Sequence, residues 1–326
     1  MPGVIDVHAH IVPPFYAQAV VDAGLVDARG RAATDGYPLP DWSLDDTLRC
    51  MDAHDIKASV LSITAPGVSF LPREDQAPLA RRLNEELAAV VRAHPRRFAN
   101  MAILPLPDVD AAAAELRFAL DQRGFDGVAL YSNFSGQYLG DPAFDPIMAQ
   151  LHERAATVFV HPAQPPGFEE LGLGFSAPIL EYPFDSTRML ANLLRNRVLE
   201  RFDRIRFVIP HGGGVFPYIA TRILGAVSSR ALGGQYASIA DAARQVSGIT
   251  YDLTAMGRET NLRMLRDGIG ADRLVVGYDY PFMPEVTIPA HIKAFDRFDG
   301  FNKADKAKIR TGNALKLFPR LAAAGA

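Results

Sequence analysis

This 326-residue chain has very little cysteine and only a small net charge. Its single cysteine, Cys50, excludes a disulfide framework, so we expect a cytoplasmic protein and interpret Cys50 as a helix packing residue rather than a nucleophile. The formal net charge of −3 gives no reason to expect a nucleic acid or an anionic membrane as partner. No apolar run approaches the roughly 18–20 residues that cross a bilayer, and no positively charged segment precedes an apolar one at the N-terminus. We therefore expect neither a membrane span nor a secretory signal.

Short apolar stretches are plentiful, in a composition that is 48% apolar. Eight of them are typical of strands, and each is followed by a helical pattern; they cover residues 4–10, 59–63, 99–104, 127–131, 157–160, 206–209, 249–253 and 273–276. Strands rich in Val, Ile and Leu suit a parallel sheet that is buried on both faces. Eight such units predict an α/β fold, a (β/α)8 TIM barrel that forms a single domain over residues 1–326. A doubly wound open sheet is the rival fold, and it is disfavoured because no Gly-x-Gly-x-x-Gly follows the first strand.

One insertion interrupts this pattern after the first strand. Residues 11–41 are rich in Gly, Pro, Asp and Ala and have no clear period, which predicts a long loop that can include a small hairpin. Long loops in compact domains are usually functional, so we expect this loop to lie over the C-terminal end of the first strand. Farther along, Ser43 and Asp108 are expected to cap helices, and Ser186 is expected to begin a helix that ends near Leu199.

The first strand ends in Asp6-x-His8-x-His10. Alternate side chains of a strand point to the same side, so we expect Asp6, His8 and His10 to face one way. Two neutral imidazoles on one side can hold a metal ion. His-x-His also occurs by chance, so the motif needs further ligands from elsewhere in the chain.

Other polar side chains follow the later strands in the same way. His161 ends the fifth strand, His211 the sixth and Asp279 the eighth. The C-terminal ends of barrel strands surround one mouth, so these side chains can share a centre with His8 and His10. Three neutral imidazoles and one carboxylate form a plausible site for one divalent metal. The remaining histidines lie on predicted helices or helix ends and are interpreted as surface or capping residues; they are His54, His94, His152 and His291.

His211 precedes three glycines and a predicted helix. Glycines allow the backbone to approach a ligand closely, and helix N-termini favour anions. We therefore interpret His211 as an acid/base residue beside the metal rather than as a ligand. The fourth strand ends in Tyr131-Ser132-Asn133, without a Lys or Glu to bridge a second metal, which favours a single ion.

Taken together, these motifs resemble a known family. The resemblance covers nearly the whole chain and rests on Asp6-x-His8-x-His10, His161-Pro162, His211-Gly212-Gly213-Gly214 and Gly277-x-Asp279-Tyr280-Pro281-Phe282. They are similar to the amidohydrolase superfamily, above all to its decarboxylase branch, which includes aminocarboxymuconate semialdehyde decarboxylase and the resorcylate-type decarboxylases. Within that branch, the chain resembles proteins of the 6-methylsalicylate decarboxylase type.

The resemblance implies one divalent metal ion per subunit, zinc or manganese, held by His8, His10, His161 and Asp279. It implies a carboxy-lyase that acts without an organic cofactor on a small hydroxyaromatic or muconate-type carboxylic acid. It also implies a homodimer or a higher homo-oligomer, in which Arg222 matches an arginine that binds a substrate carboxylate in the neighbouring subunit's site. An exposed helix arginine is the equally acceptable alternative for Arg222.

For the mechanism, we expect the carboxylate and an adjacent hydroxyl of the substrate to chelate the metal. Asp279 is the candidate proton donor, supported by His211, provided that burial raises the pKa of Asp279. Aromatic side chains available to line the pocket are Phe15, Tyr16, Phe175 and Phe282. Two alternatives remain open: a hydrolase of the same superfamily that acts on a lactone or an amide, and a non-catalytic barrel that keeps a structural metal.

Overall fold

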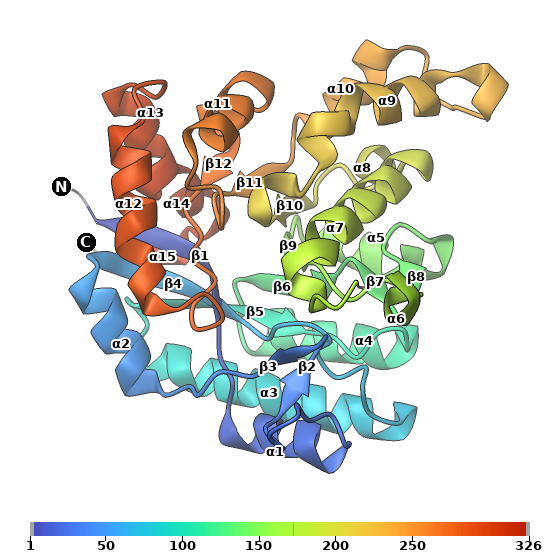
Figure 1. The fold of residues 1–326 in the computed structure, drawn as a ribbon. Coiled ribbons are helices and arrows are strands. Elements are labelled where there is room, and N and C mark those ends of the chain that lie inside the picture. Colours follow the sequence, from blue (N-terminus) through green and yellow to red (C-terminus); the bar gives the residue numbers. More distant parts are fainter. Residues whose placement is uncertain (1–2, 172, 324–326) are drawn as a thin grey trace.

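The computed structural model describes residues 3–171 and 173–323. Its centre is an eight-stranded sheet in which every paired neighbour is parallel (Figure 1). In spatial order the strands are β1 (Val4–His10), β4 (Ile56–Ser62), β5 (Phe98–Ile103), β6 (Gly127–Tyr131), β9 (Thr157–His161), β10 (Arg206–Ile209), β11 (Thr250–Asp252) and β12 (Leu274–Val275). All eight strands overlap the stretches predicted from the sequence.

The last strand returns to the first. Isolated parallel bridges join Asp6 to Val276 and Ala9 to Tyr280. The amide of Val7 donates to the carbonyl of Val276 at 2.9 Å, and the amide of His10 donates to the carbonyl of Tyr280 at 2.8 Å. These contacts complete the ring, so the predicted TIM barrel is confirmed.

Helices surround the sheet (Figure 1). They are α1 (Pro14–Asp22), α2 (Leu44–Ala53), α3 (Arg73–Ala93), α4 (Val109–Leu116), α5 (Asp145–Glu153), α6 (Phe168–Leu171), α7 (Ala177–Arg195), α8 (Val198–Arg201), α9 (Phe216–Ser228), α10 (Ile239–Val246), α11 (Glu259–Gly268), α12 (Ile288–Arg297), α13 (Lys303–Ala307), α14 (Asn313–Leu317) and α15 (Arg320–Ala323). Two π-helical turns cover Arg117–Gln122 and Lys308–Gly312, and 3-10 turns cover Pro142–Phe144, His211–Gly213, Arg230–Leu232, Ala271–Arg273 and Glu285–Thr287. None of the helices in the described part of the chain has both the length and the apolar character needed to cross a membrane.

The predicted caps of two helices are confirmed. The Ser43 hydroxyl accepts a hydrogen bond from the amide of Asp46 at 3.0 Å at the start of α2. The Asp108 carboxylate accepts one from the amide of Ala111 at 3.0 Å at the start of α4. Each cap satisfies an amide that the first turn of a helix leaves unpaired.

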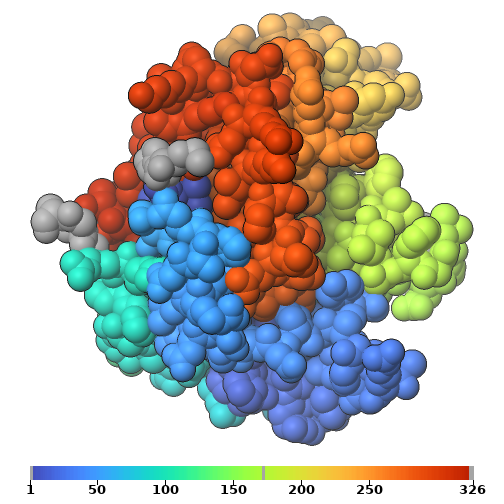
Figure 2. All heavy atoms as spheres, turned by 60° about the vertical axis from the view of Figure 1, so that its left-hand side comes forward, coloured from blue at the N-terminus to red at the C-terminus, as the bar shows by residue number. Residues whose placement is uncertain are grey.

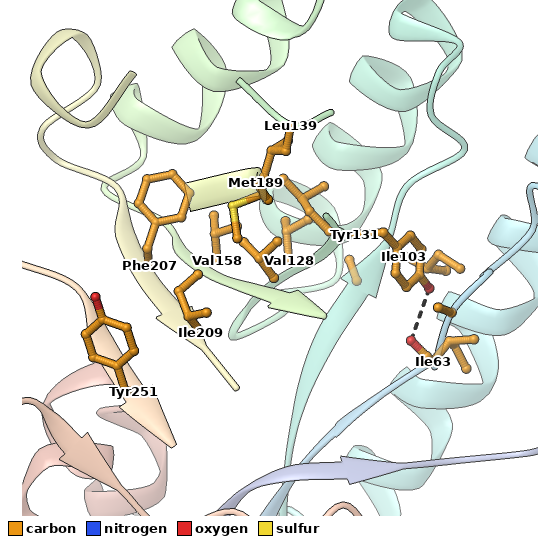
Figure 3. Packing of buried hydrophobic residues seen from close by; sticks show 14 of the residues in the cluster. Ile63, Ile103, Val128, Tyr131, Leu139, Val158, Met189, Phe207, Ile209 and Tyr251 are labelled. Carbon is orange, nitrogen blue, oxygen red and sulfur yellow. Dashed lines mark hydrogen bonds between the residues drawn. The ribbon is translucent and has the colours of Figure 1, made fainter. Parts of the chain in front are cut away.

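Two apolar layers hold the barrel together. The inner layer fills the ring of strands and includes Ile5, Val7, Met101, Phe159 and Val208. The outer layer packs the strands against the helices, and Figure 3 shows part of it, including Val128, Val158, Ile209 and Met189. In the same view the hydroxyl of Tyr131 donates to the carbonyl of Ile63 at 3.1 Å. Both strand faces are therefore buried, as the apolar strands require.

The inserted segment is more ordered than we expected. The predicted loop over residues 11–41 begins with helix α1, whose buried Tyr16 and Val20 lie four residues apart on one face. The small hairpin is present as β2 (Ala33–Thr34) paired with β3 (Tyr37–Pro38), and a second hairpin joins β7 (Asn133–Phe134) to β8 (Gln137–Tyr138). Helix α1 was not predicted, because the prolines that suggested a loop, Pro13 and Pro14, begin it. The rest of the segment consists of turns and loop around the hairpin, as predicted.

Helix α7 also differs from the prediction. It begins at Ala177, not at Ser186, because Pro183 lies inside the helix instead of preceding it. The carbonyl of Pro183 accepts hydrogen bonds from the hydroxyl of Thr187 at 2.8 Å and from the amide of Val215 at 3.3 Å. The start of α9 thus contacts α7 at the proline that lies inside this helix.

Candidate metal centre and active-site cavity

Four side chains from distant parts of the sequence converge at the C-terminal mouth of the barrel. The Nε2 atoms of His8 and His10 are 3.1 Å apart. Asp279 Oδ1 lies 3.4 Å from Nε2 of His8 and 3.1 Å from Nε2 of His10. With His161 they form a group in which each residue offers one ligand atom within 4.8 Å of the others. The sequence-predicted ligand set is therefore a spatial cluster.

An irregularity in β1 aims the two histidines inward. The pairing of β1 with β4 shifts register between Asp6 and Ala9, and Ile5 and Val7 belong to the inner apolar layer. His8 follows Val7 into the interior, so the strict alternation that we expected from Asp6 to His8 does not hold. Asp6 instead braces the backbone, because its Oδ1 accepts hydrogen bonds from the amides of His8 and Tyr278, both at 3.0 Å.

The far nitrogen of each ring has a partner that fixes the ring. Nδ1 of His8 lies 2.8 Å from Oδ2 of Asp252, and Nδ1 of His161 lies 2.7 Å from the carbonyl of Pro162. Nδ1 of His10 lies 3.0 Å from the hydroxyl of Ser62. A carboxylate and a carbonyl only accept hydrogen bonds, so His8 and His161 carry a proton on Nδ1. Their Nε2 atoms are then free to coordinate a cation.

The electrostatics of the cluster fit a cation. Burial holds the pKa of His161 well below its usual value, so this ring is neutral. Burial alone would lower the pKa of His8, but the carboxylates of Asp279 and Asp252 raise it to about 9. Asp279 Oδ1 is buried and has no partner with hydrogen-bond geometry in the described residues. A divalent ion would satisfy this oxygen and replace the proton that the two carboxylates hold on His8.

The expectation that burial raises the pKa of Asp279 is not met. Burial does act in that direction, but the neighbouring His8, His10 and His211 outweigh it and hold the pKa well below its usual value. Asp279 is therefore an ionised carboxylate, which suits a ligand better than a proton donor.

Asp252 is the site residue that the sequence did not reveal. It is fully buried at the end of β11, and besides contacting His8 it accepts hydrogen bonds from two backbone amides. Its Oδ1 accepts from the amide of His211 at 2.8 Å and from that of Thr254 at 2.9 Å. One carboxylate thus orients a ring of the cluster and the turn that carries His211. Its position at a predicted strand end was the only available signal.

His211 lies beside the cluster. Its Nε2 is 4.0 Å from Asp279 Oδ2, and its Nδ1 is buried with no hydrogen-bond partner among the described residues. The turn that presents His211 requires glycine: a Cβ on Gly213 would lie 2.7 Å from the Tyr251 ring, and one on Gly214 would lie 2.1 Å from a backbone oxygen. The glycines therefore serve the close packing of this turn.

A cavity of about 270 Å³ opens onto the cluster. Its lining is mostly apolar and consists of Thr34, Tyr37, Thr64, His161, Pro178, Ile179, Tyr182, Pro183, His211, Thr254, Ala255, Met256, Asp279, Phe282 and Met283. Phe282 also lies against the centre, with its ring centroid 5.4 Å from that of His10. The hairpin of the inserted segment supplies Thr34 and Tyr37, so this segment forms part of the wall.

The other predicted aromatic residues do not line the cavity. Tyr16 is fully buried in α1, where its hydroxyl donates to the carbonyl of Gly67. Phe15 packs under the guanidinium of Arg82 at 3.9 Å, and Phe175 is exposed on the surface. Arg222 lies on the exposed face of α9 and does not line the cavity of its own chain. Its predicted role concerns the site of a neighbouring subunit and stays a prediction.

Comparison with known proteins agrees with this geometry. A family model described as Amidohydrolase (Amidohydro_2) matches residues 5–320. This chain belongs to the amidohydrolase family. This match and the named relatives described below confirm the resemblance to the decarboxylase branch that the sequence motifs indicated.

Among relatives of this amidohydrolase, Decarboxylase yanB of Aspergillus niger is 31% identical over 97% of this chain and 87% of its own length. The 6-methylsalicylic acid decarboxylase of Penicillium expansum is 30% identical over 97% of this chain and 96% of its own. A crystal structure of 2,6-dihydroxybenzoate decarboxylase complexed with 2,6-dihydroxybenzoate superposes with a TM-score of 0.80. That chain is 25% identical, and the match covers 98% of this chain and 100% of the other.

Proposed function

We propose that this amidohydrolase is a metal-dependent, non-oxidative decarboxylase of a small hydroxyaromatic carboxylic acid. The observation that carries the proposal is the cluster of His8, His10, His161 and Asp279 at one end of a mostly apolar cavity. Relatives that align over nearly the whole chain are named decarboxylases, and one of them acts on 6-methylsalicylic acid.

The cavity walls favour an aromatic monocarboxylate. Phe282, Tyr37 and Met256 offer flat or pliable apolar surface to a ring. Among the described residues that line the cavity there is no Lys or Arg. A substrate carboxylate therefore has to be neutralised at the metal centre, and a second carboxylate, as in a muconate-type acid, would need a cation from outside, for which Arg222 of another copy is the candidate.

The proposed ligands are His8, His10, His161 and Asp279, a donor set that both zinc and manganese accept. A divalent ion held by these residues would supply a Lewis acid for the carboxylate and the adjacent hydroxyl group of the substrate. The protein keeps these ligands in place through Asp252, Ser62 and the carbonyl of Pro162.

In the reaction, the bond between the ring carbon and the carboxyl carbon breaks and its electron pair stays on the ring carbon. That carbon takes a proton, and carbon dioxide leaves. We assign proton delivery to His211, whose ring lines the cavity within 4.0 Å of Asp279. Asp279, as an ionised carboxylate, orients His211 and completes the ligand set.

A hydrolase of a lactone or an amide would use the same side chains, with His211 or Asp279 as base. The names of the relatives favour decarboxylation, and no feature of the cavity favours hydrolysis over it. A homo-oligomeric state and a cytoplasmic location remain predictions.

The test is carbon dioxide release by the zinc- or manganese-loaded protein. We expect release from 2-hydroxybenzoates, and no release from 4-hydroxybenzoate, which has no hydroxyl beside the carboxylate and cannot chelate through both oxygens. His161→Ala should abolish release because it removes a ligand. His152→Ala, at a half-buried helix histidine outside the cavity, is the matched control and should leave the rate unchanged. Equal release by His161→Ala and the wild type, or hydrolysis of lactones without decarboxylation, would overturn the proposal.

A further inference from the structure

A second group of metal-ligating side chains lies outside the cavity. Cys50 and His54 are four residues apart in α2 and at its C-terminal cap, so they lie on one side of the helix. Glu285 comes from the 3-10 turn that follows β12. Both views show this segment after β12, coloured orange, beside the light blue helix α2 (Figures 1 and 2). Two distant parts of the chain therefore meet at these three residues.

The three side chains are close enough to share an ion. Nε2 of His54 lies 3.2 Å from Oε1 of Glu285, and one atom of each of the three residues lies within 4.8 Å of the others. Cys50 is 1% exposed, whereas the side chains of His54 and Glu285 are 16% and 30% exposed. We propose that Cys50, His54 and Glu285 form a second cation site, which binds zinc and is separate from the centre in the barrel mouth.

The donor set selects the metal. A thiolate and an imidazole favour zinc over magnesium or calcium, which prefer oxygen ligands. Ligand atoms around a tetrahedral zinc are about 3.5 Å apart, as follows from bonds of about 2.0–2.3 Å. Atoms that are up to 4.8 Å apart therefore have to approach by about 1.3 Å or less, which rotation of the half-buried His54 and Glu285 side chains can supply. Three protein ligands leave the fourth position of a tetrahedral ion open for water.

The surroundings of Cys50 are anionic. Burial and the carboxylates of Glu285 and Asp6 raise the pKa of Cys50 to about 12, so the thiol is protonated until a metal replaces its proton. The opposing charge is Arg49, whose guanidinium lies 3.2 Å from Oε2 of Glu285. That side chain is 60% exposed and contacts the other carboxylate oxygen, so it forms a weak surface pair that leaves Oε1 to the metal.

Zinc at this site would join α2 to the segment that carries Asp279 and Phe282. The site does not depend on the decarboxylase proposal, because none of its three residues lines the cavity.

Cobalt substitution tests the inference directly. Cobalt(II) replaces zinc in such sites and absorbs in the near ultraviolet when a thiolate is bound to it. Because Cys50 is the only cysteine in the sequence, a thiolate-to-cobalt band reports this site alone. We expect the full-length wild-type protein to show the band and to bind one more equivalent of metal than Cys50→Ala.

Two further variants make the result specific. His161→Ala should lose metal from the barrel mouth and keep the thiolate band. Glu285→Gln, which keeps the cysteine and the size of the side chain, should weaken cobalt binding at the thiolate at least tenfold. Absence of the band in the wild type, or a band of equal affinity in Glu285→Gln, would overturn the inference, whatever the outcome of the decarboxylase assay.

Discussion

Nδ1 of His8 lies 2.8 Å from Oδ2 of Asp252, with both side chains fully buried. This carboxylate fixes the imidazole so that its Nε2 faces the metal centre. In Asp252→Asn the amide can present its NH2 group to Nδ1, which favours a proton on Nε2 and blocks coordination. We expect metal affinity to fall about 10- to 100-fold, as measured by competition with a chelator.

Asp6→Asn is the control for this variant. Asp6 is also buried near His8, but in the described part of the chain its Oδ1 accepts hydrogen bonds from two backbone amides rather than from a ring nitrogen. An asparagine oxygen can accept the same two bonds, so metal affinity should stay close to that of the wild type. Equal losses in the two variants would mean that general disruption, rather than orientation of His8, explains the result.

His211→Asn separates proton transfer from metal binding. His211 has a positive φ of 54°, a conformation that asparagine tolerates, so the turn should survive the change. We expect kcat to fall by about 100- to 10,000-fold with unchanged metal content, because the ring supplies the proton but is not among the proposed ligands. Loss of metal from this variant would instead make His211 a ligand, and an unchanged kcat would remove its assigned role.

The sequence predicted the barrel and the clustered side chains because both depend on local patterns. Apolar strands with helical stretches between them indicate the fold, and the fold then places every strand end at one mouth. His161 and Asp279 could be connected to His8 and His10 in this way, although they lie far apart along the chain.

Features that depend on tertiary packing could not be predicted from the sequence. The irregularity that turns His8 inward is a property of the pairing between β1 and β4, which no pattern in β1 alone reveals. Asp252 has no neighbouring histidine in the sequence, and its partner His8 lies at the other end of the chain. The pKa of Asp279 is lowered and not raised as predicted, because the effect of three nearby imidazoles exceeds that of burial. The distances to these imidazoles depend on the tertiary structure.

A variant of Arg222 tests whether the substrate is a monocarboxylic or a dicarboxylic acid. If another copy places this arginine at the cavity, it can bind only a carboxylate that the metal centre does not already hold. We expect Arg222→Gln to leave the KM for 2-hydroxybenzoates unchanged and to raise the KM for a dicarboxylic analogue, with kcat retained in both cases. Steady-state kinetics with the two acids provide the measurement. An unchanged KM for both would show that Arg222 is only an exposed helix residue.

Asp35→Asn should stabilise the protein at neutral pH. Asp35 joins the hairpin wall of the cavity to α7, since its Oδ2 accepts from the hydroxyl of Tyr182 at 2.8 Å and from the amide of Gln164 at 3.0 Å. Burial nevertheless raises the pKa of Asp35, so its ionised form is disfavoured in the folded state. The variant removes this cost and can keep both hydrogen bonds, and asparagine also suits the φ of 53° at this position.

The pH dependence of that gain has a definite sign. A raised folded-state pKa destabilises the fold above that pKa and has no effect below the unfolded value of about 3.9. Urea unfolding should therefore show a higher free energy of unfolding for Asp35→Asn than for the wild type at pH 7, with the difference vanishing near pH 4. Asp27→Asn is the opposite control, because hydrogen bonds from Arg31 and Arg29 lower the pKa of Asp27. It should lose stability at pH 7 and not at low pH, and a stability gain for Asp35→Asn that is independent of pH would rule out burial of the charge as its cause.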